Sequence, residues 1–427
     1  MKADSLVIGG GVAGVQAALD LAEAGYKVVL IERKPSLGGR MAQLDKTFPT
    51  NDCSICILSP KLADVIGNAN VTVMTITEAI GLEGEAGSFT VKLLKHPRYV
   101  DIDACTNCGA CIEKCPVNVL DEFDRELRER KAIYSYFLQG VPAAVAIDPE
   151  HCLKLTAGKC GLCERICTAG AINYADKEEY IDLEVASIVV ATGLEEFDAR
   201  LLPNLGYGRI KNVVTGLDFE RLLCASGPTD GHLVRLDNHK PVKRLAFVQC
   251  AGSRNTRIVT HCSTVCCMHS TKEAMLAFEH DKEVESTVFY ADLRATGKGF
   301  QEYVARASGE YNVTYVNGRV SNLQEDDDGN PIVHYEDIHT GKRHELAFDM
   351  VVLAVALVPS RGTQEVAAAL ELELSPAGFL KTDAYDYTRA SREGIFACGF
   401  CRGPMDIPES VACASSAAAH AAEMVTK

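Results

Sequence analysis

Two adjacent cysteines, Cys266 and Cys267, stand in the segment HCSTVCCMHSTKEA at residues 261–274. Neighbouring cysteines seldom form a disulfide with each other, because the bridge is strained at that separation. The chain has 18 cysteines among 427 residues, and its N-terminus leads directly into the apolar segment SLVIGGGVAG without a charged leader. We therefore expect a cytoplasmic protein, and in that reducing compartment many cysteines indicate metal or redox chemistry rather than a disulfide framework.

A second group of cysteines has the spacing of iron-sulfur ligands. The segment CTNCGACIEKCP follows the C-x2-C-x2-C-x3-C-P run of bacterial ferredoxins, in which the fourth cysteine ligates the other cluster of a pair. The segment HCLKLTAGKCGLCERIC is less regular, with seven residues between its first two cysteines and Thr168 where proline is usual. A zinc site fits less well, because the tight triplet followed by Cys-Pro does not suit a tetrahedral ion. The expected ligands of two 4Fe-4S clusters are Cys105, Cys108, Cys111 and Cys167 for one, and Cys115, Cys152, Cys160 and Cys163 for the other.

The first 40 residues predict the element that binds a dinucleotide. An apolar strand, SLVI, leads into a turn containing Gly9, Gly11 and Gly14, and an alanine-rich helix and a second strand, KVVLIE, follow. The glycines let backbone amides approach a pyrophosphate at the helix N-terminus, where the helix dipole also favours an anion. Glu32 ends the second strand 18 residues after Gly14, where an acid can hydrogen-bond the adenosine ribose.

The segments that follow favour FAD over NAD as this dinucleotide. ERKPSLGGR resembles the second loop of flavoproteins with two dinucleotide-binding domains, which implies that Arg33, Gly39 and Arg40 lie along the FAD. EVASIVVATG, with Gly193, resembles the segment that leads out of the FAD domain, and REGIFACGF, with Gly399, resembles the closing FAD segment. That closing segment usually has an aspartate after its glycine. Phe400 stands there instead, so backbone amides are expected to serve in its place.

Together these segments predict an α/β fold, a thioredoxin-reductase-like flavoprotein with two dinucleotide-binding domains and an inserted two-cluster ferredoxin module. The FAD-domain pattern stops near residue 100 and resumes near residue 180. The expected divisions are residues 1–100 and 181–240 for the FAD-binding domain, 101–180 for the insert, 241–355 for a region resembling the NAD domain, and 356–427 for the closing segment.

The region resembling the NAD domain lacks the expected nucleotide turn. Its first strand, VKRLAFVQC, is followed by AGSRNTRIVTHCSTVCC and not by a glycine-rich turn, so its amides cannot cradle a pyrophosphate in the usual way. Cys250 instead stands at the carboxyl end of this strand, where ligands of open α/β sheets bind. Cys262, Cys266 and Cys267 follow at the start of the next helix.

Several segments resemble the HdrA-like flavoproteins, the family of the A subunit of heterodisulfide reductase, which includes the A subunit of quinone-interacting membrane-bound oxidoreductase complexes. They are FPTNDCSICILSPKL, VQCAGSR, CSTVCCM, ADLRATGKGFQEY and GFCRGPMDIPESVACASSAAAHAA. The resemblance covers essentially the whole chain. It implies a third 4Fe-4S cluster on Cys250, Cys262, Cys266 and Cys267, whose alternative is a set of buried apolar cysteines. It also implies an FAD contact at Ile407.

Lys272 and the pair Cys53 and Cys56 keep alternatives open. The resemblance favours a position for Lys272 beside the flavin, where a cation stabilises reduced flavin, and the alternative is a solvated lysine on the helix surface. Cys53 and Cys56 form a C-x2-C pair soon after the GGR segment. They are a structural pair, ligands of a further cluster, or a dithiol that exchanges electrons with FAD.

The resemblance implies an FAD and iron-sulfur oxidoreductase of anaerobic metabolism that bifurcates or confurcates electrons. The expected partners are the other subunits of a heterodisulfide-reductase-like or quinone-interacting complex, ferredoxin, and a second copy of this chain. The alternatives are a stand-alone disulfide reductase linked to ferredoxin or NAD(P)H, and a non-catalytic electron relay. The net charge of −15 argues against nucleic acid as a partner, and no apolar run is long enough to span a membrane, so any membrane association is peripheral.

The missing glycine turn predicts that neither NADH nor NADPH alone reduces the flavin at a useful rate. The measurement is stopped-flow absorbance of the flavin band after mixing with either nucleotide. Dithionite serves as the positive control, because it reduces flavin without a nucleotide site. Rapid bleaching by either nucleotide would show that the region after VKRLAFVQC binds it by another route.

Overall fold

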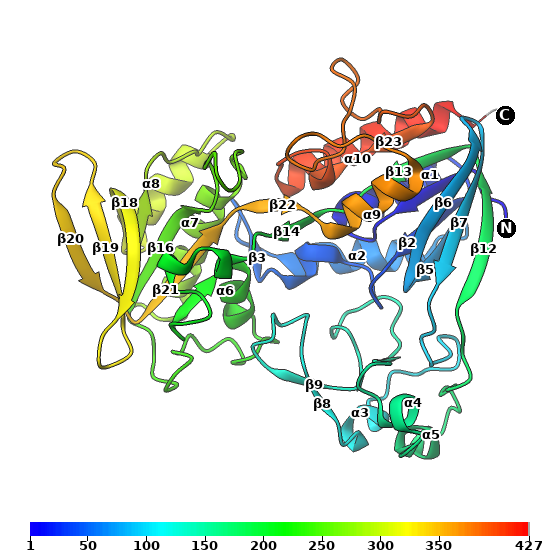
Figure 1. The fold of residues 1–427 in the computed structure, drawn as a ribbon, viewed down its shortest axis with the longest axis horizontal. Helices are drawn as coiled ribbons and strands as arrows, with labels where there is room; N and C mark the ends of the chain where they lie inside the picture. The colour runs from blue at the N-terminus through cyan, green and yellow to red at the C-terminus, as the bar shows by residue number, and fades with distance from the viewer. Residues whose placement is uncertain (426–427) are drawn as a thin grey trace. The chain divides into compact units, whose positions relative to one another are not determined.

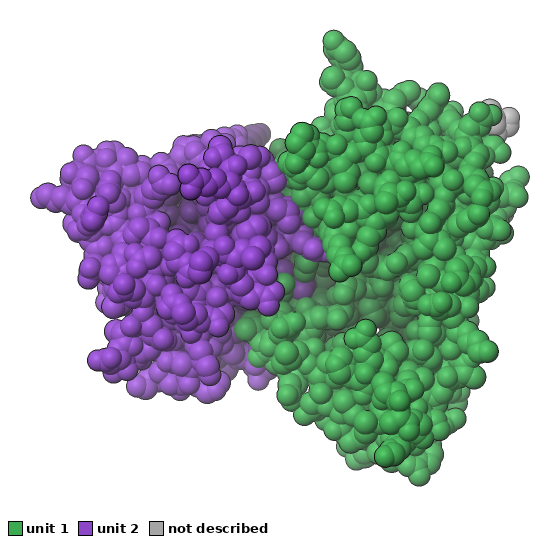
Figure 2. Space-filling model, in the orientation of Figure 1, with its two compact units in different colours: residues 1–42, 55–194, 359–427 green, residues 43–54, 195–358 purple. Residues whose placement is uncertain are grey.

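A computed structural model describes residues 1–425 of the chain in two compact units (Figure 2). Unit 1 comprises Met1–Ala42, Ile55–Leu194 and Pro359–Lys427, and unit 2 comprises Gln43–Ser54 and Glu195–Val358. Within the described residues, no helix has both the length and the apolar character needed to cross a membrane.

Unit 1 is built on a five-stranded parallel sheet in the order β23-β13-β1-β2-β5 (Figure 1). A three-stranded antiparallel sheet, β12-β7-β6, belongs to the same unit. The bounds of these strands are Ser5–Ile8 for β1, Val28–Glu32 for β2, Val71–Thr75 for β5, Thr77–Glu85 for β6, Ser88–Lys95 for β7, Glu179–Val185 for β12, Ser187–Val190 for β13 and Ile395–Ala397 for β23. The main helices are α1 (Val12–Glu23), α2 (Ser54–Gly67), α9 (Arg361–Leu370) and α10 (Ile407–Glu423).

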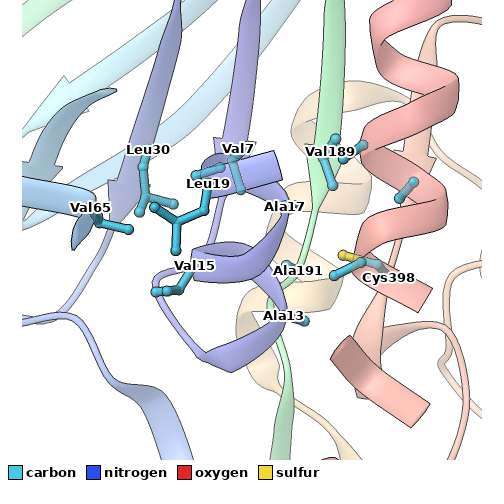
Figure 3. Packing of buried hydrophobic residues seen from close by; sticks show 14 of the residues in the cluster. Val7, Ala13, Val15, Ala17, Leu19, Leu30, Val65, Val189, Ala191 and Cys398 are labelled. Atoms are coloured by element: carbon cyan, nitrogen blue, oxygen red, sulfur yellow. The ribbon is translucent and has the colours of Figure 1, made fainter. Parts of the chain in front are cut away.

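Small side chains allow the helices of unit 1 to lie close to the sheet and to each other. Helix α1 carries four alanines in VAGVQAALDLAE at positions including Ala13 and Ala17, and it packs against the alanine-rich α10. Figure 3 shows Val7, Leu30 and Val189 of the strands meeting Val15 and Leu19 of α1. The core therefore fixes the start of α1 against the ends of β1 and β13.

The insert leaves and rejoins unit 1 through two paired strands. Strands β7 and β12 are antiparallel neighbours, with Lys95 opposite Glu179, so residues 96–178 form a loop whose ends are adjacent. It holds three one-turn helices and four short strands: α3 (Ala110–Lys114), β8 (Asn118–Leu120), β9 (Glu129–Lys131), β10 (Ile133–Tyr134), β11 (Ala146–Ile147), α4 (Leu153–Ala157) and α5 (Leu162–Ile166). The predicted limits of the insert, 101–180, agree closely with this loop.

Unit 2 is built on a seven-stranded sheet in the order β15-β21-β16-β17-β18-β19-β20. The first five strands are parallel, and β18, β19 and β20 are antiparallel neighbours. Their bounds are Val213–Thr215 for β15, Arg244–Ala251 for β16, Glu285–Tyr290 for β17, Val313–Glu325 for β18, Pro331–Asp337 for β19, Arg343–Ala347 for β20 and Met350–Val355 for β21. The helices are α6 (Gly216–Leu223), α7 (Cys266–His280) and α8 (Phe300–Glu310).

The remaining short elements are two-residue and three-residue strands and four 3-10 turns. They are η1 (Gly39–Gln43), β3 (Lys46–Thr47), β4 (Asp52–Cys53), β14 (Leu194–Glu196), η2 (Ala199–Leu201), η3 (Pro203–Leu205), β22 (Leu357–Pro359) and η4 (Gly399–Cys401). Strands β14 and β22 pair with each other where the chain passes between the units.

The division of the chain differs from the predicted one at residues 195–240. We expected them to complete the FAD-binding domain, but they belong to unit 2. The reason is strand pairing, because β15 lies parallel to β21 with Val213 opposite Val351, and it forms one edge of the unit 2 sheet. Residues 43–54 also belong to unit 2. Neither the pairing of β15 with β21 nor the assignment of residues 43–54 to unit 2 leaves a local signal in the sequence.

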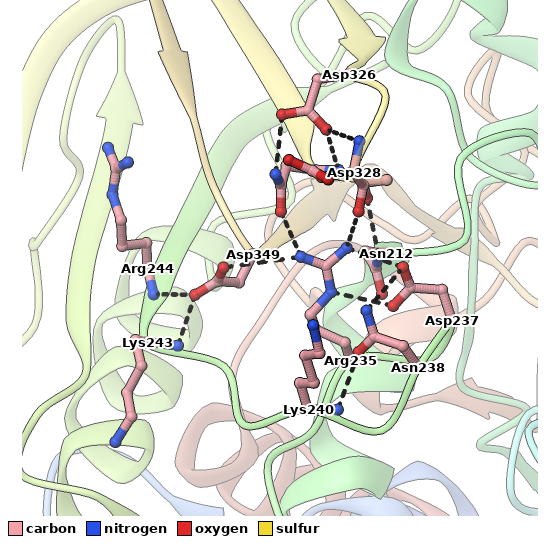
Figure 4. A network of polar contacts seen from close by, with 12 residues as sticks. Asn212, Arg235, Asp237, Asn238, Lys240, Lys243, Arg244, Asp326, Asp328 and Asp349 are labelled. Carbon is pink, nitrogen blue, oxygen red and sulfur yellow. Dashed lines mark hydrogen bonds and ion pairs between the residues drawn. The ribbon is translucent and has the colours of Figure 1, made fainter.

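A buried arginine, Arg235, ties the antiparallel part of the unit 2 sheet to the loop before β16 (Figure 4). Its guanidinium pairs with Asp237 at 2.8 Å, donates to the carbonyl of Asp328 at 3.0 Å, and donates to the side chain of Asn330. Hydrogen bonds from Arg235 hold the pKa of Asp237 down at about 2. This network is structural, because each of its charges has a partner inside the unit.

Candidate flavin and iron-sulfur sites

The predicted FAD glycines meet at the start of helix α1. A side chain on Gly9 (φ +110°) would place its Cβ 2.4 Å from the carbonyl oxygen of Ala191, and one on Gly14 would lie 1.8 Å from the carbonyl oxygen of Gly9. A Cβ on Gly39 (φ +56°) would lie 2.8 Å from the Cα of Gly11, so the GGR loop touches the glycine turn directly. Only glycine allows this close approach of backbone segments.

Glu32 is held by the same turn. Its carboxylate accepts hydrogen bonds from the backbone amide of Gly10 at 2.7 Å and from that of Lys34 at 2.8 Å. Burial raises the pKa of Glu32, while these two amides act in the opposite direction. The side chain is therefore fixed at the end of β2, the position that a ribose contact requires.

The other predicted FAD residues surround this turn. Gly399 (φ +70°) approaches α1 so closely that a Cβ would lie 2.9 Å from the Cβ of Ala13. Phe400 is buried with its ring 6.0 Å from that of Phe379, so the side chain after Gly399 contributes to the core. The remaining positions are Arg33 beside Glu365 at 3.5 Å, Arg40 donating to the carbonyl of Leu194 at 3.3 Å, Gly193 with φ +72°, and Ile407 as the first residue of α10.

The two cysteine runs of the insert have the same local geometry despite their different spacing. Helices α3 and α5 each follow a left-handed glycine, Gly109 (φ +78°) and Gly161 (φ +107°). Each carries a cysteine at its second position, and each ends at an extended cysteine, Cys115 or Cys167. The extra residues of the second run form α4, which begins after Cys152. Helices α3 and α5 pack together, so the two runs lie side by side in the insert.

One cavity in the insert is lined by four of the predicted ligands. They are Cys115, Cys152, Cys160 and Cys163, the set expected to share a cluster. Tyr174 lines the same cavity, and its hydroxyl lies 2.7 Å from the Sγ of Cys163. Cubane ligands need this arrangement, in which thiolates from two chain segments face a common space.

The other predicted set lies in the same buried layer of the insert. Cys105, Cys111 and Cys167 pack with Val145 and Ile147, and Cys108 is exposed just before α3. The backbone amide of Ala171 donates to the Sγ of Cys167 at 3.4 Å. Burial raises the pKa of Cys111 to about 11, so a bound metal has to displace its proton.

The four cysteines predicted to hold a third cluster all belong to unit 2. Strand β16 runs through Cys250, which has a positive φ of +58°, and helix α7 begins at Cys266. Burial and the neighbouring charges of Cys267, Cys250 and Cys262 raise the pKa of Cys266 to about 12. The role of these four cysteines as ligands of a cluster stays a prediction.

Hydrogen-bond donors around these four cysteines act against burial, which raises the pKa of Cys250 and Cys267. Backbone amides of Thr264 and Arg294 donate to the sulfurs of Cys262 and Cys267, each at 3.4 Å. The guanidinium of Arg254 lies 3.9 Å from the Sγ of Cys250. Donors and cations of this kind stabilise thiolates and the cluster that they hold.

Lys272 is buried in unit 2, so the alternative of a solvated lysine is wrong. Its side chain is 1% exposed, and its ammonium is ion-paired with Glu220 of α6. It also donates to the carbonyl of Lys46 at 3.0 Å. Although burial raises the pKa of Glu220, the Lys272 charge and His269, whose Nε2 lies 2.6 Å away, hold it down at about 2.

The sequence analysis missed the two buried acids beside Lys272. Glu273 is completely buried, and its carboxylate makes no hydrogen bond. The distance from its Oε1 to His269 Nε2 is 3.5 Å. Glu220, His269 and Glu273 could together hold a metal ion, but the Lys272 ammonium already neutralises Glu220 and opposes a second cation. The sequence feature that points to these acids is the position of Glu220 and Glu273 within the helical segments GLDFERLL and TKEAMLAF, which carry many apolar residues.

Cys53 and Cys56 are disulfide-bonded, whereas the other 16 cysteines are free. Among the three alternatives for this pair, a bridged state argues against ligands of a further cluster, since a cluster ligand must be a free thiolate. Cys398, Cys401 and Cys413 are buried in the core of unit 1, and Cys224 ends helix α6.

Comparisons with known families agree with this arrangement. A model described as FAD dependent oxidoreductase matches residues 4–52, a 4Fe-4S dicluster domain matches 104–171, and a pyridine nucleotide-disulphide oxidoreductase model matches 271–418. The predicted fold class and the predicted cofactors, FAD and 4Fe-4S clusters, are confirmed. The last match begins after the loop where a nucleotide turn would lie.

Curated relatives align with almost the whole chain. One is the iron-sulfur A subunit of CoB-CoM heterodisulfide reductase from Methanocaldococcus jannaschii, 46% identical over 97% of this chain and 63% of that protein. Another is one of the corresponding A subunits from Methanopyrus kandleri, 48% identical over 98% of this chain and 64% of that protein. The chain spans less than two thirds of the length of these relatives.

Solved structures show the same fold at low sequence identity. Thioredoxin reductase from Lactococcus lactis matches with a TM-score of 0.55 and 18% identity, covering 99% of this chain and 98% of that one. The T. acidophilum thioredoxin reductase matches with a TM-score of 0.54 and 14% identity over the same shares.

The raised pKa of Glu273 predicts a pH-dependent effect of its replacement. Burial keeps the carboxyl protonated in the folded chain, so the stability of the wild type falls as pH rises above the ordinary pKa of glutamate. Glu273→Gln removes this loss, and its advantage in unfolding free energy grows with pH by up to about 1.4 kcal/mol per pH unit. Chemical denaturation at several pH values measures it. Glu310→Gln, on the exposed end of α8, is the control and leaves the pH profile unchanged. A constant difference between Glu273→Gln and wild type would contradict the prediction.

Proposed function

We propose that this chain, which belongs to the HdrA-like flavoproteins of heterodisulfide reductase, passes electrons between FAD and 4Fe-4S clusters within a larger redox complex. The chain is an oxidoreductase with an FAD domain and a two-cluster ferredoxin module. The observation that carries the proposal is that the insert holding two matched cysteine sets belongs to the same unit as the FAD glycines. Flavin and clusters in one unit provide a route for single electrons.

The cysteine sets are proposed as ligands of three clusters. Cys105, Cys108, Cys111 and Cys167 hold the first, Cys115, Cys152, Cys160 and Cys163 the second, and Cys250, Cys262, Cys266 and Cys267 the third. The FAD lies along Gly9, Gly11, Gly14, Glu32, Arg33, Gly39, Arg40, Gly193, Gly399 and Ile407. In this arrangement the protein supplies binding, orientation and charge, and the cofactors supply the redox chemistry.

The proposed reaction is electron bifurcation or its reverse, confurcation. FAD accepts two electrons, and one leaves toward a low-potential acceptor such as ferredoxin while the other leaves toward a disulfide-linked or quinone-linked partner subunit. One relative is named as part of an H(2):CoB-CoM heterodisulfide,ferredoxin reductase, a name that combines a heterodisulfide with ferredoxin. The second candidate is a disulfide reductase that acts alone, which the bridged Cys53 and Cys56 favour.

A redox titration of the flavin distinguishes bifurcation from a simple relay. Bifurcation requires the second electron to leave FAD at a lower potential than the first, so the one-electron form of the flavin stays scarce throughout the titration. A relay gives two well-separated one-electron steps in the usual order. Accumulation of the one-electron form would overturn the proposal of bifurcation and leave the electron-transfer role intact.

The third cluster predicts the iron content of the chain. Anaerobically purified protein is expected to hold roughly 12 iron atoms if all three cubanes are present, or roughly 8 if only the insert is loaded. Replacing both Cys266 and Cys267 with serine is expected to remove one cluster and leave FAD bound. Cys224→Ser, outside every proposed set, is the control. Unchanged iron in the double variant would disprove the third ligand set.

Lys272 is proposed to lie beside the flavin. Removing its positive charge and removing the negative charge of Glu220 are therefore expected to shift the flavin midpoint potential in opposite directions. Lys272→Met removes a cation and is expected to lower the flavin midpoint potential by about 20 to 65 mV, if the interaction contributes about 1 to 3 kcal/mol. Glu220→Gln removes the paired anion and is expected to raise the potential. Spectroscopic redox titration measures both. Glu220 keeps His269 as a partner in Lys272→Met, whereas Glu220→Gln leaves the buried Lys272 cation without a carboxylate, which costs about 3 to 5 kcal/mol of stability. Potentials that shift in the same direction, or not at all, would assign the pair to structure alone.

A further inference from the structure

Arg98 is a buried cation in unit 1, three residues after strand β7. Its side chain makes four hydrogen bonds, and every acceptor is neutral. Nε donates to the carbonyl of Val145 at 3.0 Å and Nη2 to that of Ala144 at 2.9 Å. Nη1 donates at 3.0 Å both to the carbonyl of Pro35 and to the hydroxyl of Thr75.

No carboxylate pairs with this guanidinium among residues 1–425. Asp176, which contacts this segment, accepts instead from the backbone amides of Arg98 and Tyr99, at 3.0 and 3.1 Å. Arg235, the comparably buried arginine of unit 2, is by contrast paired with Asp237. Burying an unpaired cation costs several kcal/mol, and burial accordingly lowers the pKa of Arg98 to about 10.

The groups around Arg98 connect the FAD loop to the cysteines of the insert. Pro35 lies in the loop ERKPSLGGR, where the amide of Leu37 also donates to the carbonyl of Val141 at 2.8 Å. On the other side, Val145 packs in the buried layer that contains Cys105 and Cys111. Val100, two residues after Arg98, packs in the same layer, so the chain at Arg98 lies beside the layer that holds these cysteines.

We propose that the counter-charge of Arg98 is the iron-sulfur cluster held by Cys105, Cys108, Cys111 and Cys167, and that Arg98 raises the reduction potential of that cluster. Four thiolates give a cluster net negative charge, which increases by one unit when an electron arrives. A fixed cation in a medium of low dielectric constant favours the more negative state, so it favours reduction. The charge of Arg98 thereby makes it easier for this cluster to accept an electron from the flavin. The inference rests on the ligand set proposed above.

The test is an EPR-monitored redox titration of the iron-loaded chain. Arg98→Gln removes the charge but can still donate hydrogen bonds, and it is expected to lower the potential of one cluster of the insert. Arg98→Lys keeps the charge without the planar fork and is expected to keep the potential near the wild-type value. Arg165→Gln is the matched control. This residue lies between Cys163 and Cys167 but is exposed, so solvent screens its charge and a smaller shift is expected.

Three outcomes would overturn the inference. Equal potentials in Arg98→Gln and wild type would show that the charge does not act on the cluster. Equal shifts in Arg98→Gln and Arg98→Lys would assign Arg98 to structure alone, as would loss of iron from both variants. Failure of the underlying ligand set is distinguishable, because Cys105→Ser and Cys111→Ser would then keep the full iron content and the EPR signal.

Discussion

Eight cysteines have to come together in the insert with few other residues to hold them in place. Its buried layer consists of a few aliphatic side chains and the cysteines themselves, including Cys111, Cys152 and Cys163. A core of this size provides little stability, and small domains of this kind usually depend on metal or on covalent links. The pairing of β7 with β12 brings the two ends of the insert together, and in the proposed holoprotein the clusters supply the rest. Folding of the insert and loading of its clusters are then one process.

The buried cations of this protein differ in whether a carboxylate neutralises them. Arg235 meets Asp237 inside unit 2, and Lys272 meets Glu220, so each of these cations has a carboxylate partner. Arg98 is bound only by neutral oxygens, which satisfy its hydrogen bonds without cancelling its charge. A buried cation can have all its hydrogen bonds satisfied and still lack a neutralising anion. Its charge then acts electrostatically on neighbouring groups. This distinction is what makes Arg98 a redox residue and Arg235 a structural one.

Local spacing predicts residues that the structure brings together, namely the glycines around Gly9 and the four cysteines that line the cavity of the insert. Their roles toward FAD and the clusters stay predictions. Sequence reasoning did not reveal that β15 pairs with β21, which moves residues 195–240 into unit 2. It also missed Glu220 and Glu273, because an acid in an apolar helix resembles a surface position until the packing of α6 on α7 is known. Arg98 has no signature at all, since its acceptors come from three distant points of the chain.

Two of the proposed cluster ligands lie at positions of backbone strain. Cys160 has φ +83° and Cys250 has φ +58°, a region that glycine adopts freely and other residues enter at a cost of about 1 to 3 kcal/mol. Such strain persists only where the surroundings fix the residue, and it tends to mark functional positions. At Cys250 the strained residue stands near the end of β16, where a nucleotide-binding unit would begin its glycine turn. A glycine there would relieve the strain but provide no thiolate. The chain thus turns sharply at this strand end and carries a thiol on the turning residue, which is the feature on which the proposed third ligand set rests.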